Sequence, residues 1–415
     1  MAHRGHRDRA LETRRICEAC AMISRIRRVL GTFIEALPEA VSLAVRPSRY
    51  RYRRVDRPRP APVLNAKTRL LIGHANYAAQ GYWFARAAER IDDVAAVNVH
   101  LLGPNEKYGF PADIPVSAQI FQHSAHWRRE HFRRVTTNYT HVIIESGLPI
   151  FGKLFGHDVL AEINALRAHG LTVALLAHGS ELRQPSRHAS TDEWSPYAPG
   201  RWPETARLEA RTKAFKALLG QADVPLFVTT QELLEDWPSA TWIPLSINLA
   251  RWSAALPFMD RPQPVVVHAP TNPYLKNTAL IEPTMQWLHD EGVVEYRRLP
   301  SVTSQQMPAL IGDADVVLDQ FGAGCYSVAS VEGMAAGRLV IAHVHEQVRQ
   351  IVRESTGWEI PIVSATPGTL DNVLRDVVAR PEHYRAIAAR GPDFTAAVHD
   401  GRLSAAALKP FLTGS

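Results

Sequence analysis

The sequence predicts an α/β protein with two facing, doubly wound domains and a cleft between them, preceded by a basic N-terminal extension. Three observations lead to this fold class. The chain has 415 residues, of which 46% are hydrophobic, so it can bury more than one core. Short apolar runs of strand length alternate with stretches of helical period. Polar, glycine-bearing loops follow several of the apolar runs, which is typical of parallel sheets covered by helices.

The first alternating series begins after the basic extension. Its opening strand, "TRLLIGH" at 68–74, leads through a loop into the amphipathic helix "YWFARAAERI" at 82–91. A further helix is expected at 159–170. The remaining strands of this series are expected at 94–102, 140–146, 171–179, 224–230 and 240–247.

A second series follows an irregular, proline-bearing linker at 248–264. Its strands are expected at 265–269, 294–299, 316–320 and 339–342, and its helices at 277–292, 304–313, 328–335, 369–390 and 394–412. The chain is therefore divided into four regions. They are a basic, partly helical or disordered arm at 1–66, an N-terminal domain at 67–250, a C-terminal domain at 251–393, and a C-terminal helix at 394–415 that could cross back.

The positive charge is concentrated near the N-terminus. Residues 1–60 contain fifteen arginines, six acidic residues and no lysine, so this segment carries +9. Because the net charge of the whole chain is +6, the rest of the protein carries −3. A mildly acidic body argues against a nucleic-acid-binding protein.

Cysteine is scarce, with only Cys17, Cys20 and Cys325 in the chain. This excludes a disulfide framework and favours a reducing cytoplasm. Cys17 and Cys20 form a C-x-x-C pair, but no βαβ pattern surrounds them and no second pair completes a zinc site. We therefore disfavour a redox or metal role for this pair.

Two interpretations of the N-terminal arm stay open. In "AMISRIRRVLGTFIEAL" at 21–37 an apolar stripe lies beside three arginines, and a basic run with two tyrosines follows at 46–62. Such a segment could rest on an anionic membrane surface, at the inner face of the plasma membrane. The alternative is a disordered extension. Two glutamates and a proline interrupt the apolar tract at 29–45, so it is neither a signal core nor a membrane span.

A single carboxylate stands out in the apolar stretch "SVASVEGMAAGRLVIAHV" at 327–344. Apolar residues recur at helical spacing from 328 to 335, Gly337 suits a helix C-terminus, and a buried strand follows. Glu332 is therefore expected in the first turn of a helix, just beyond the carboxyl end of the strand at 316–320. Ligands bind at this place in open α/β sheets.

This stretch resembles the E-x-M-A-x-G signature of the GT-B glycosyltransferases, specifically their group 1 or GT4-like members. Four further elements of that family occur in the expected order, namely "IGHANYAAQGYWFARA" at 72–87, "LLAHGSELRQPSRHA" at 175–189, "VTTQELLEDWPSATWIPLSI" at 228–247 and "VVHAPTNPYLKNTALI" at 266–281. The resemblance covers residues 67–412. It implies the GT-B fold of two Rossmann-like domains, and transfer of a sugar from a nucleotide-diphospho-sugar to an acceptor hydroxyl with retention of configuration.

The resemblance implies roles for three residues. Glu332 would accept hydrogen bonds from the ribose hydroxyls of the donor, as an acid does in dinucleotide sites. Lys276 would stabilise charge on the diphosphate leaving group. His178, at the end of an apolar strand, would contact the transferred sugar. The simpler alternatives are a buried structural glutamate, a surface lysine and a core or helix-capping histidine. A surface lysine is the less usual choice here, because the chain has seven lysines against forty arginines.

The other candidate residues lie in loops at the strand ends. Donor-binding candidates, beside Lys276 and Glu332, are Gly73, Asn76, Gln80, Gly81, His268, Thr271, Asn272, Gly324, Cys325, Tyr326 and Ser327. Candidates for acceptor or loop contacts are Glu181, Arg183, Ser186 and Arg187.

The sequence departs from the family pattern at one position. Many members carry an additional glutamate eight residues before the one on the ribose, and Gly324 occupies that position here. Three explanations stay open. The hexose is held by backbone and by neighbours such as Asp319 and Gln320, the donor differs, or transfer is impaired.

No cofactor or metal ion is expected. "DAD" at 313–315 resembles the metal-binding D-x-D of the other large glycosyltransferase fold, but it enters a buried strand, so we interpret it as turn chemistry. The expected partners are a nucleotide-sugar donor and a glycan, lipid or natural-product acceptor, without nucleic acid. Two alternative functions remain. One is a nucleotide-sugar epimerase or hydrolase, and the other is a catalytically silent GT-B-like partner protein that binds a nucleotide.

Overall fold

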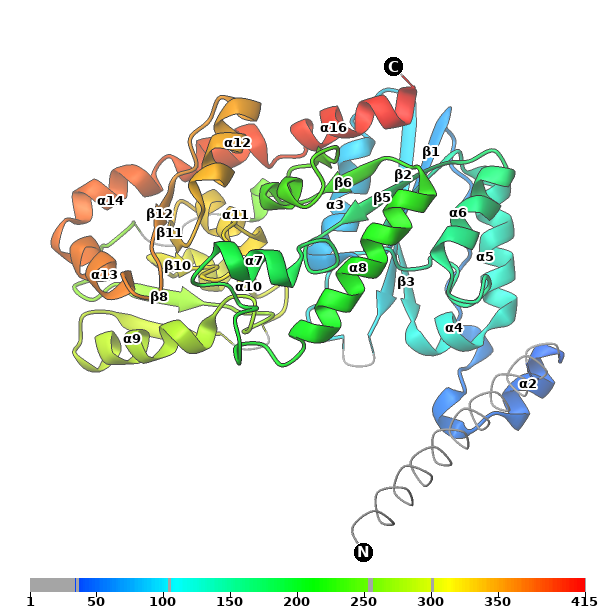
Figure 1. Ribbon diagram of the computed structural model, residues 1–415, viewed down its shortest axis with the longest axis horizontal. Helices are drawn as coiled ribbons and strands as arrows, with labels where there is room; N and C mark the ends of the chain where they lie inside the picture. Colours follow the sequence, from blue (N-terminus) through cyan, green and yellow to red (C-terminus); the bar gives the residue numbers. More distant parts are fainter. Residues whose placement is uncertain (1–33, 35–36, 104–105, 253–256, 300–301, 415) are drawn as a thin grey trace, which may run out of the picture.

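A computed structural model of the protein describes residues 34, 37–103, 106–252, 257–299 and 302–414. Within them the chain forms two β-sheets, one of seven strands and one of five, with helices packed around each (Figure 1). Every pair of neighbouring strands is parallel. The predicted fold class, an α/β protein with two Rossmann-like domains, is confirmed.

The first sheet has the strand order β3-β2-β1-β4-β5-β6-β7, so the direction of winding reverses between β1 and β4. Its central strands are mostly apolar and buried, as parallel strands covered on both faces must be. The strands are β1 (Thr68–His74), β2 (Val94–Leu102), β3 (Ile114–Ser117), β4 (His141–Glu145), β5 (Thr172–Ala177), β6 (Leu226–Val228) and β7 (Thr241–Trp242). The helices of this domain are η3 (Tyr77–Ala79), α3 (Gln80–Ala88), α4 (Ala118–His123), α5 (Ala125–Asn138), α6 (Val159–Ala168), α7 (Pro185–Thr191), α8 (Thr205–Ala222) and η4 (Gln231–Glu235).

The second sheet has the order β12-β11-β10-β8-β9 and reverses between β8 and β10. Its strands are β8 (Val265–His268), β9 (Glu295–Arg298), β10 (Val316–Leu318), β11 (Leu339–Ala342) and β12 (Ile362–Ser364). The helices that follow β7 along the chain are η5 (Leu249–Arg251), α9 (Thr278–Asp290), α10 (Met307–Gly312), α11 (Val328–Ala335), α12 (Glu346–Thr356), α13 (Leu370–Ala379), α14 (Pro381–Ala388), α15 (Gly391–Val398) and α16 (Arg402–Thr413).

Several elements lie where the sequence shows no clear pattern. The edge strand β3 contains Pro115, which has no N–H to donate to a ladder and weakens a strand signal. Helix α5 is rich in arginine and histidine, and its buried face includes the polar residues Arg128 and His131. A helix of this composition shows little hydrophobic periodicity in the sequence. Tertiary packing therefore supplies most of its stability.

The C-terminal helix α16 returns from the second domain to the first, as Figure 1 shows along one side of the molecule. Leu408 and Leu412 of α16 are buried in the same core as Leu70 and Phe84 of the first domain. The Thr68 hydroxyl also donates to the Leu412 carbonyl, 3.2 Å away. The helix thereby covers one face of the first sheet.

The described part of the N-terminal extension contains α2 (Glu39–Val45), η1 (Ser48–Tyr50) and η2 (Arg54–Asp56). Glu39 accepts hydrogen bonds from Tyr52, Arg54, Arg57 and Ser124, so it joins the basic run to the body. These contacts hold the pKa of Glu39 below its usual value, although burial acts in the opposite direction. Apart from residues 34 and 37, the predicted amphipathic helix at 21–37 lies outside the described residues, as does the C-x-x-C pair. Among the helices that the structure describes, none is both long and apolar enough to cross a bilayer.

Candidate functional site

The candidate donor site lies at the carboxyl ends of β8 and β10, where the loops to α9 and α11 meet. Helix α11 begins after Ser327, whose side chain accepts a hydrogen bond from the Ala329 N–H. Small residues allow α11 to pack closely on the sheet, because a Cβ on Gly333 would be only 3.0–3.2 Å from Val340 and Val317 side chains. Glu332 follows one turn after the start of α11, rather than within its first turn as the sequence suggested.

A buried aspartate at the end of β10 joins these loops. Asp319 accepts from the Lys276 ammonium at 2.7 Å, from the Ser327 hydroxyl at 2.7 Å and backbone N–H at 2.8 Å, and from the Ser330 hydroxyl at 2.6 Å. Burial raises the pKa of Asp319, but Lys276 and the two serines outweigh it, and the pKa lies below its usual value. Asp319 therefore holds Lys276 in place. With both oxygens occupied and no exposed surface, it is a poor candidate for contact with a hexose.

Glu332 differs from Asp319 in having no partner for its carboxyl group among the described residues. The side chain is half-buried, and burial raises its pKa to about 8, although Lys276 and Arg251 favour the charged form. Groups with a strongly shifted pKa of this kind gather at functional sites.

His268 and Asn272 are engaged within the domain. The His268 ring lies 3.0 Å from the Leu318 carbonyl through Nδ1 and 2.9 Å from the Thr278 hydroxyl through Nε2. Since a carbonyl only accepts, Nδ1 carries the proton and Nε2 accepts. Burial lowers the pKa of His268 to about 4. The Asn272 side chain accepts from two backbone N–H groups of its own loop, those of Tyr274 and Leu275, so it shapes the loop that carries Lys276.

Gly324 has a structural reason to be glycine. Its φ angle is +69°, and an added Cβ would lie 2.3–2.6 Å from three ring atoms of His345. The imidazole of His345 thus occupies the space where the family resemblance expects an acidic side chain. His345 in turn donates from Nε2 to the Asp192 carboxylate of the first domain, 3.0 Å away.

The residues after Gly324 point into the protein. Cys325 is fully buried, and burial raises the pKa of its thiol. The Tyr326 hydroxyl lies 3.0 Å from the Gln231 amide of the first domain and 3.2 Å from His399. Cys325 and Tyr326 therefore offer a ligand little more than their backbone groups, whereas Ser327 caps α11.

In the first domain a histidine and a glutamate meet at the ends of β4 and β5. His178 Nε2 lies 2.9 Å from Glu145 Oε1, and the other Glu145 oxygen accepts from the Asn76 N–H at 3.0 Å. A Cβ on Gly81 would be 2.9 Å from the Glu145 carboxyl, so only glycine allows α3 to begin there. Glu145 is fully buried, and it fixes the orientation of the His178 ring.

The other predicted amides in this loop bond to the protein. Gln80 exchanges two hydrogen bonds with the backbone of Ser246, at 3.1 and 2.9 Å. The Asn76 side chain donates to the Pro111 carbonyl at 3.0 Å and accepts from the Tyr82 N–H at 2.9 Å. Both side chains thus connect segments of the first domain. Gly73, at the end of β1, allows close packing, because a Cβ there would lie 3.2 Å from Val99.

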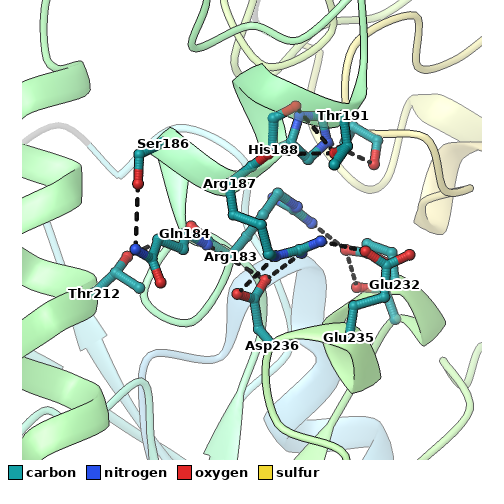
Figure 2. A network of polar contacts seen from close by, with 12 residues as sticks. Arg183, Gln184, Ser186, Arg187, His188, Thr191, Thr212, Glu232, Glu235 and Asp236 are labelled. Atoms are coloured by element: carbon teal, nitrogen blue, oxygen red, sulfur yellow. Dashed lines mark hydrogen bonds and ion pairs between the residues drawn. The ribbon is translucent and has the colours of Figure 1, made fainter.

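The four candidates for acceptor contacts form a charged network inside the first domain, shown in part in Figure 2. Arg183 pairs with Glu232, and Arg187 pairs with Glu235 and Asp236. The Ser186 hydroxyl donates to Glu209 at 3.0 Å, and Glu181 accepts from the Ser146 hydroxyl and the His178 N–H, both at 2.7 Å. These pairs fix the segment after β5 against η4 and α8.

Sequence reasoning did not single out Glu145 or His345. It considered Asp319 only as a contact for the hexose and not as the partner of Lys276. Glu145 and Asp319 each end a buried strand, and an acid at the carboxyl end of a parallel strand is a usable signal. His345 had no such signal, because its relation to Gly324 and Asp192 arises only from packing between segments far apart in the chain.

The two domains share a cavity of about 530 Å³ near this contact. The first domain contributes Arg187, His188, Glu232 and Glu235 to its walls. The second domain contributes mainly the segment after β11, which includes His343 and His345.

No protein-family model matches the chain, and no curated protein matches it either. Solved structures do. Sucrose-phosphate synthase from Thermosynechococcus elongatus has 14% identity and a TM-score of 0.55, over 81% of this chain and 96% of that one. HepE from Anabaena, in complex with UDP and glucose, has 12% identity and a TM-score of 0.53, over 84% and 100%. In complex with UDP-glucose the same protein has 10% identity and a TM-score of 0.53, over 82% and 98%. The chain therefore has the two-domain GT-B fold of these proteins, as its sequence motifs predict.

Proposed function

We propose that the protein is a glycosyltransferase that takes a sugar from a nucleotide-diphospho-sugar and passes it to an acceptor hydroxyl with retention of configuration. The donor would bind mainly to the C-terminal domain, between the loop of Lys276 and helix α11. The acceptor would bind on the side of the N-terminal domain that carries His178.

The observation that carries this proposal is the unpartnered carboxyl of Glu332 close to the buried ammonium of Lys276. A ribose with two vicinal hydroxyls supplies the donors that Glu332 lacks, and a diphosphate supplies charge for a lysine. Asp319 already holds Lys276 in position, so little reorganisation is needed when the ligand binds.

The similar structures support this choice of ligand. HepE from Anabaena has the same fold over 82–84% of this chain and 98–100% of its own, and its structures contain UDP, UDP with glucose, or UDP-glucose. A nucleotide-sugar is therefore the first ligand class to test for this chain.

The chemistry we propose relies on positioning and on charge stabilisation. Lys276 would stabilise charge that develops on the diphosphate as the glycosidic bond breaks, and the backbone N–H groups of Cys325 and Tyr326 would add to this. The His178 ring, held by Glu145, would bind a hydroxyl of the transferred sugar. The phosphate oxygen of the donor would help to take the proton of the acceptor, so none of these protein groups acts as a nucleophile.

A binding screen with single-residue variants tests the donor site. We expect one of UDP-, GDP-, ADP- or dTDP-sugars to raise the melting temperature of the full chain, since a ligand that binds the folded state stabilises it. Glu332→Gln should lose this shift and remain folded. Lys276→Ala should also lose it, but this change leaves Asp319 without its counter-charge, so Glu332→Gln is the decisive variant. Glu354→Gln, an exposed glutamate on α12, is the matched control and should bind normally. An unchanged shift in Glu332→Gln would contradict the proposed ribose contact.

One observation favours a second candidate function. Because His345 fills the space beside Gly324, the hexose lacks a carboxylate that many family members provide. A catalytically silent protein that binds a nucleotide would tolerate this change. Product analysis of the bound nucleotide-sugar, with and without an acceptor, separates the possibilities. Transfer supports the first proposal, an isomerised sugar or free sugar without an acceptor indicates an epimerase or hydrolase, and binding without turnover indicates the silent protein.

We also propose that the N-terminal arm holds the protein at an anionic membrane surface, where a lipid or glycan acceptor would be available. Four arginines of the basic run already contact Glu39, Asp56 or nearby carbonyls, namely Arg51, Arg53, Arg54 and Arg57. The attraction would therefore come mainly from residues 1–36. The Tyr139 hydroxyl donates to the Pro62 carbonyl and Ala61 lies in the core, so a deletion should end before α2. Deletion of residues 1–36 should abolish flotation with phosphatidylserine-containing liposomes, and equal flotation of both proteins would rule out the arm as an anchor.

A further inference from the structure

Three side chains with metal-binding groups converge where the two domains meet. Asp192 follows α7 in the first domain, and His343 and His345 follow β11 in the second. Asp192 Oδ2 lies 3.0 Å from His345 Nε2 and 4.0 Å from His343 Nδ1. One ligand atom from each of the three residues lies within 4.8 Å of the other two.

Each of the three groups is fixed by its surroundings. The second oxygen of Asp192 accepts from the Trp194 N–H at 2.7 Å, which orients the carboxylate. The backbone of His343 donates to the Gln320 carbonyl at 2.7 Å, and that of His345 donates to the Gly324 carbonyl at 2.9 Å. These bonds connect both histidines to the loop that precedes α11. A site whose ligands are held in this way needs little ordering on binding.

One ring nitrogen in the cluster, Nδ1 of His343, lacks a hydrogen-bond partner among the described residues. This nitrogen is buried, and the nearest acidic oxygen is the one 4.0 Å away on Asp192. A buried ring nitrogen without a partner is costly, so a ligand that satisfies it is favoured.

The cluster opens on the cavity of about 530 Å³ between the domains. His345 keeps 30% of its side-chain surface exposed, whereas Asp192 keeps 3%. Glu232 and Glu235 lie in the wall of the same cavity, and each is paired with an arginine, Arg183 and Arg187 respectively. His188 is close by but has no free ring nitrogen, since Nδ1 contacts the Ser195 hydroxyl and Nε2 the Ala323 carbonyl.

We propose that Asp192, His343 and His345 form a binding site for a divalent transition metal of the zinc class, and that the bound ion joins the two domains. Two imidazoles and one carboxylate are ligands that Zn²⁺ prefers, whereas Mg²⁺ and Ca²⁺ prefer oxygen alone. The three ligands leave a coordination position that a water or a substrate oxygen from the cavity can fill.

The two separations that involve Asp192 require only a small adjustment. Ligand atoms around a tetrahedral zinc ion lie roughly 3.3–3.5 Å apart, because the bonds to zinc are about 2.0–2.2 Å long. The Asp192–His345 pair is slightly closer than this and the Asp192–His343 pair slightly farther. The partly exposed His345 ring can rotate to even out these separations. The ion would take the place of the proton that now lies between Asp192 and His345.

The site also gives Gly324 a second role. Only a residue without a side chain allows the His345 ring to lie against the backbone at this point. The glycine that replaces an acid of the family pattern therefore makes room for a metal ligand. This inference does not depend on glycosyl transfer, since zinc binding can be measured without a nucleotide-sugar.

Calorimetric titration with ZnCl₂ tests the site. All proteins should be full-length and carry Cys17→Ser and Cys20→Ser, so that the C-x-x-C pair does not bind zinc. We expect the parent to bind one equivalent, and Asp192→Asn, His343→Gln and His345→Gln each to bind it about tenfold or more weakly. Zinc should raise the melting temperature of the parent and not that of the three variants.

Two controls make the experiment decisive. His289→Gln and His383→Gln remove exposed histidines elsewhere in the second domain and should leave zinc affinity unchanged. Melting without zinc shows whether each variant is folded, and the conservative Asp192→Asn keeps a group that can still bond to His345. No binding by the parent, or equal binding by parent and the three variants, would overturn the site. If zinc affinity fell in the two histidine variants and not in Asp192→Asn, the proposal that the ion joins the two domains would be overturned.

Discussion

Glu332 is an acid whose burial acts against the stability of the folded chain. It is a half-buried acid without a hydrogen-bond partner among the described residues, and its pKa is raised to about 8 because burial disfavours the charged form. Above its ordinary pKa of 4.5 the unfolded chain loses this proton while the folded chain keeps it. The folded state is therefore disfavoured increasingly as the pH rises from about 4.5 to about 8.

Glu332→Gln should accordingly stabilise the ligand-free protein in a pH-dependent way. Near pH 4.5 the two proteins should have similar stability, whereas near pH 8 the variant should be more stable by roughly 1–3 kcal/mol. Melting temperatures measured from pH 4.5 to 8.5 check this. If the variant were less stable at every pH, Glu332 would have a structural partner and the ligand role would lose its main support.

Gly324 can be tested at the same scale. Gly324→Ala should cost about 1–3 kcal/mol of unfolding free energy, because it adds strain at a φ of +69° and a clash with His345. Gly357 is a matched control, since its φ of +75° is similar and a Cβ there would meet nothing within 4 Å. Gly357→Ala should thus cost less, and urea unfolding of both variants measures the difference. Equal losses would show that the His345 ring moves away easily.

At the scale of elements, the junction of β10 with α11 depends on one carboxylate. Asp319 joins the end of the strand to the first turn of the helix through Ser327 and Ser330, and to the loop before α9 through Lys276. Because all of its partners are donors, the aspartate is satisfied only in its charged form. The junction in this way places Lys276 next to Glu332 before any ligand arrives.

Asp319→Asn should be far more harmful than removal of a single serine contact. Loss of the negative charge leaves the buried Lys276 ammonium unpaired, which should cost about 3–5 kcal/mol. Ser330→Ala removes one hydrogen bond and should cost about 1 kcal/mol. Urea unfolding of the two variants at pH 7 provides the comparison. Similar losses would mean that Lys276 finds another partner or an exit to solvent.

At the scale of the whole molecule, several buried histidines are held neutral. Burial lowers the pKa of His74, His268 and His399 to about 4 and that of His131 to about 3. Below about pH 6.5 these residues take up protons in the unfolded chain and not in the folded one. The stability that they provide at neutral pH is therefore lost as the pH falls from about 6.5 toward 4.

His131→Phe isolates one of these contributions. The His131 ring stacks on Trp127, is fully buried, and has no hydrogen bond at either nitrogen within the part of the chain that the structure describes. A phenylalanine fits the same aromatic cluster without titrating. Its advantage over the parent should grow below pH 6.5 by up to about 1.4 kcal/mol per pH unit. Urea midpoints of both proteins at pH 7.5, 6 and 5 measure this, and parallel curves would show that His131 is protonated or exposed in the folded state.

The sequence predicted the parts of the fold that depend on local pattern. Strand β1 and strand β2 match the expected ranges, because an apolar run bounded by turn residues defines a buried parallel strand. Helix α5 and strand β3 could not be predicted in this way. The burial of Arg128 and His131 in α5, and the edge position of Pro115, depend on neighbours from other segments.

By itself, the sequence determined the fold class and the order of the motifs, because both follow from hydrophobic period and local turn chemistry. It also singled out Glu332, Lys276 and His178, because their motifs resemble those of the GT-B glycosyltransferases and Glu332 is a lone carboxylate in an apolar stretch. Only the tertiary structure decided which of these groups are already paired, and that His345 lies against Gly324 and meets Asp192 from the other domain. The contact with Asp192 joins residues 153 positions apart, and its geometry is set by the packing of whole domains, on which local sequence carries no information.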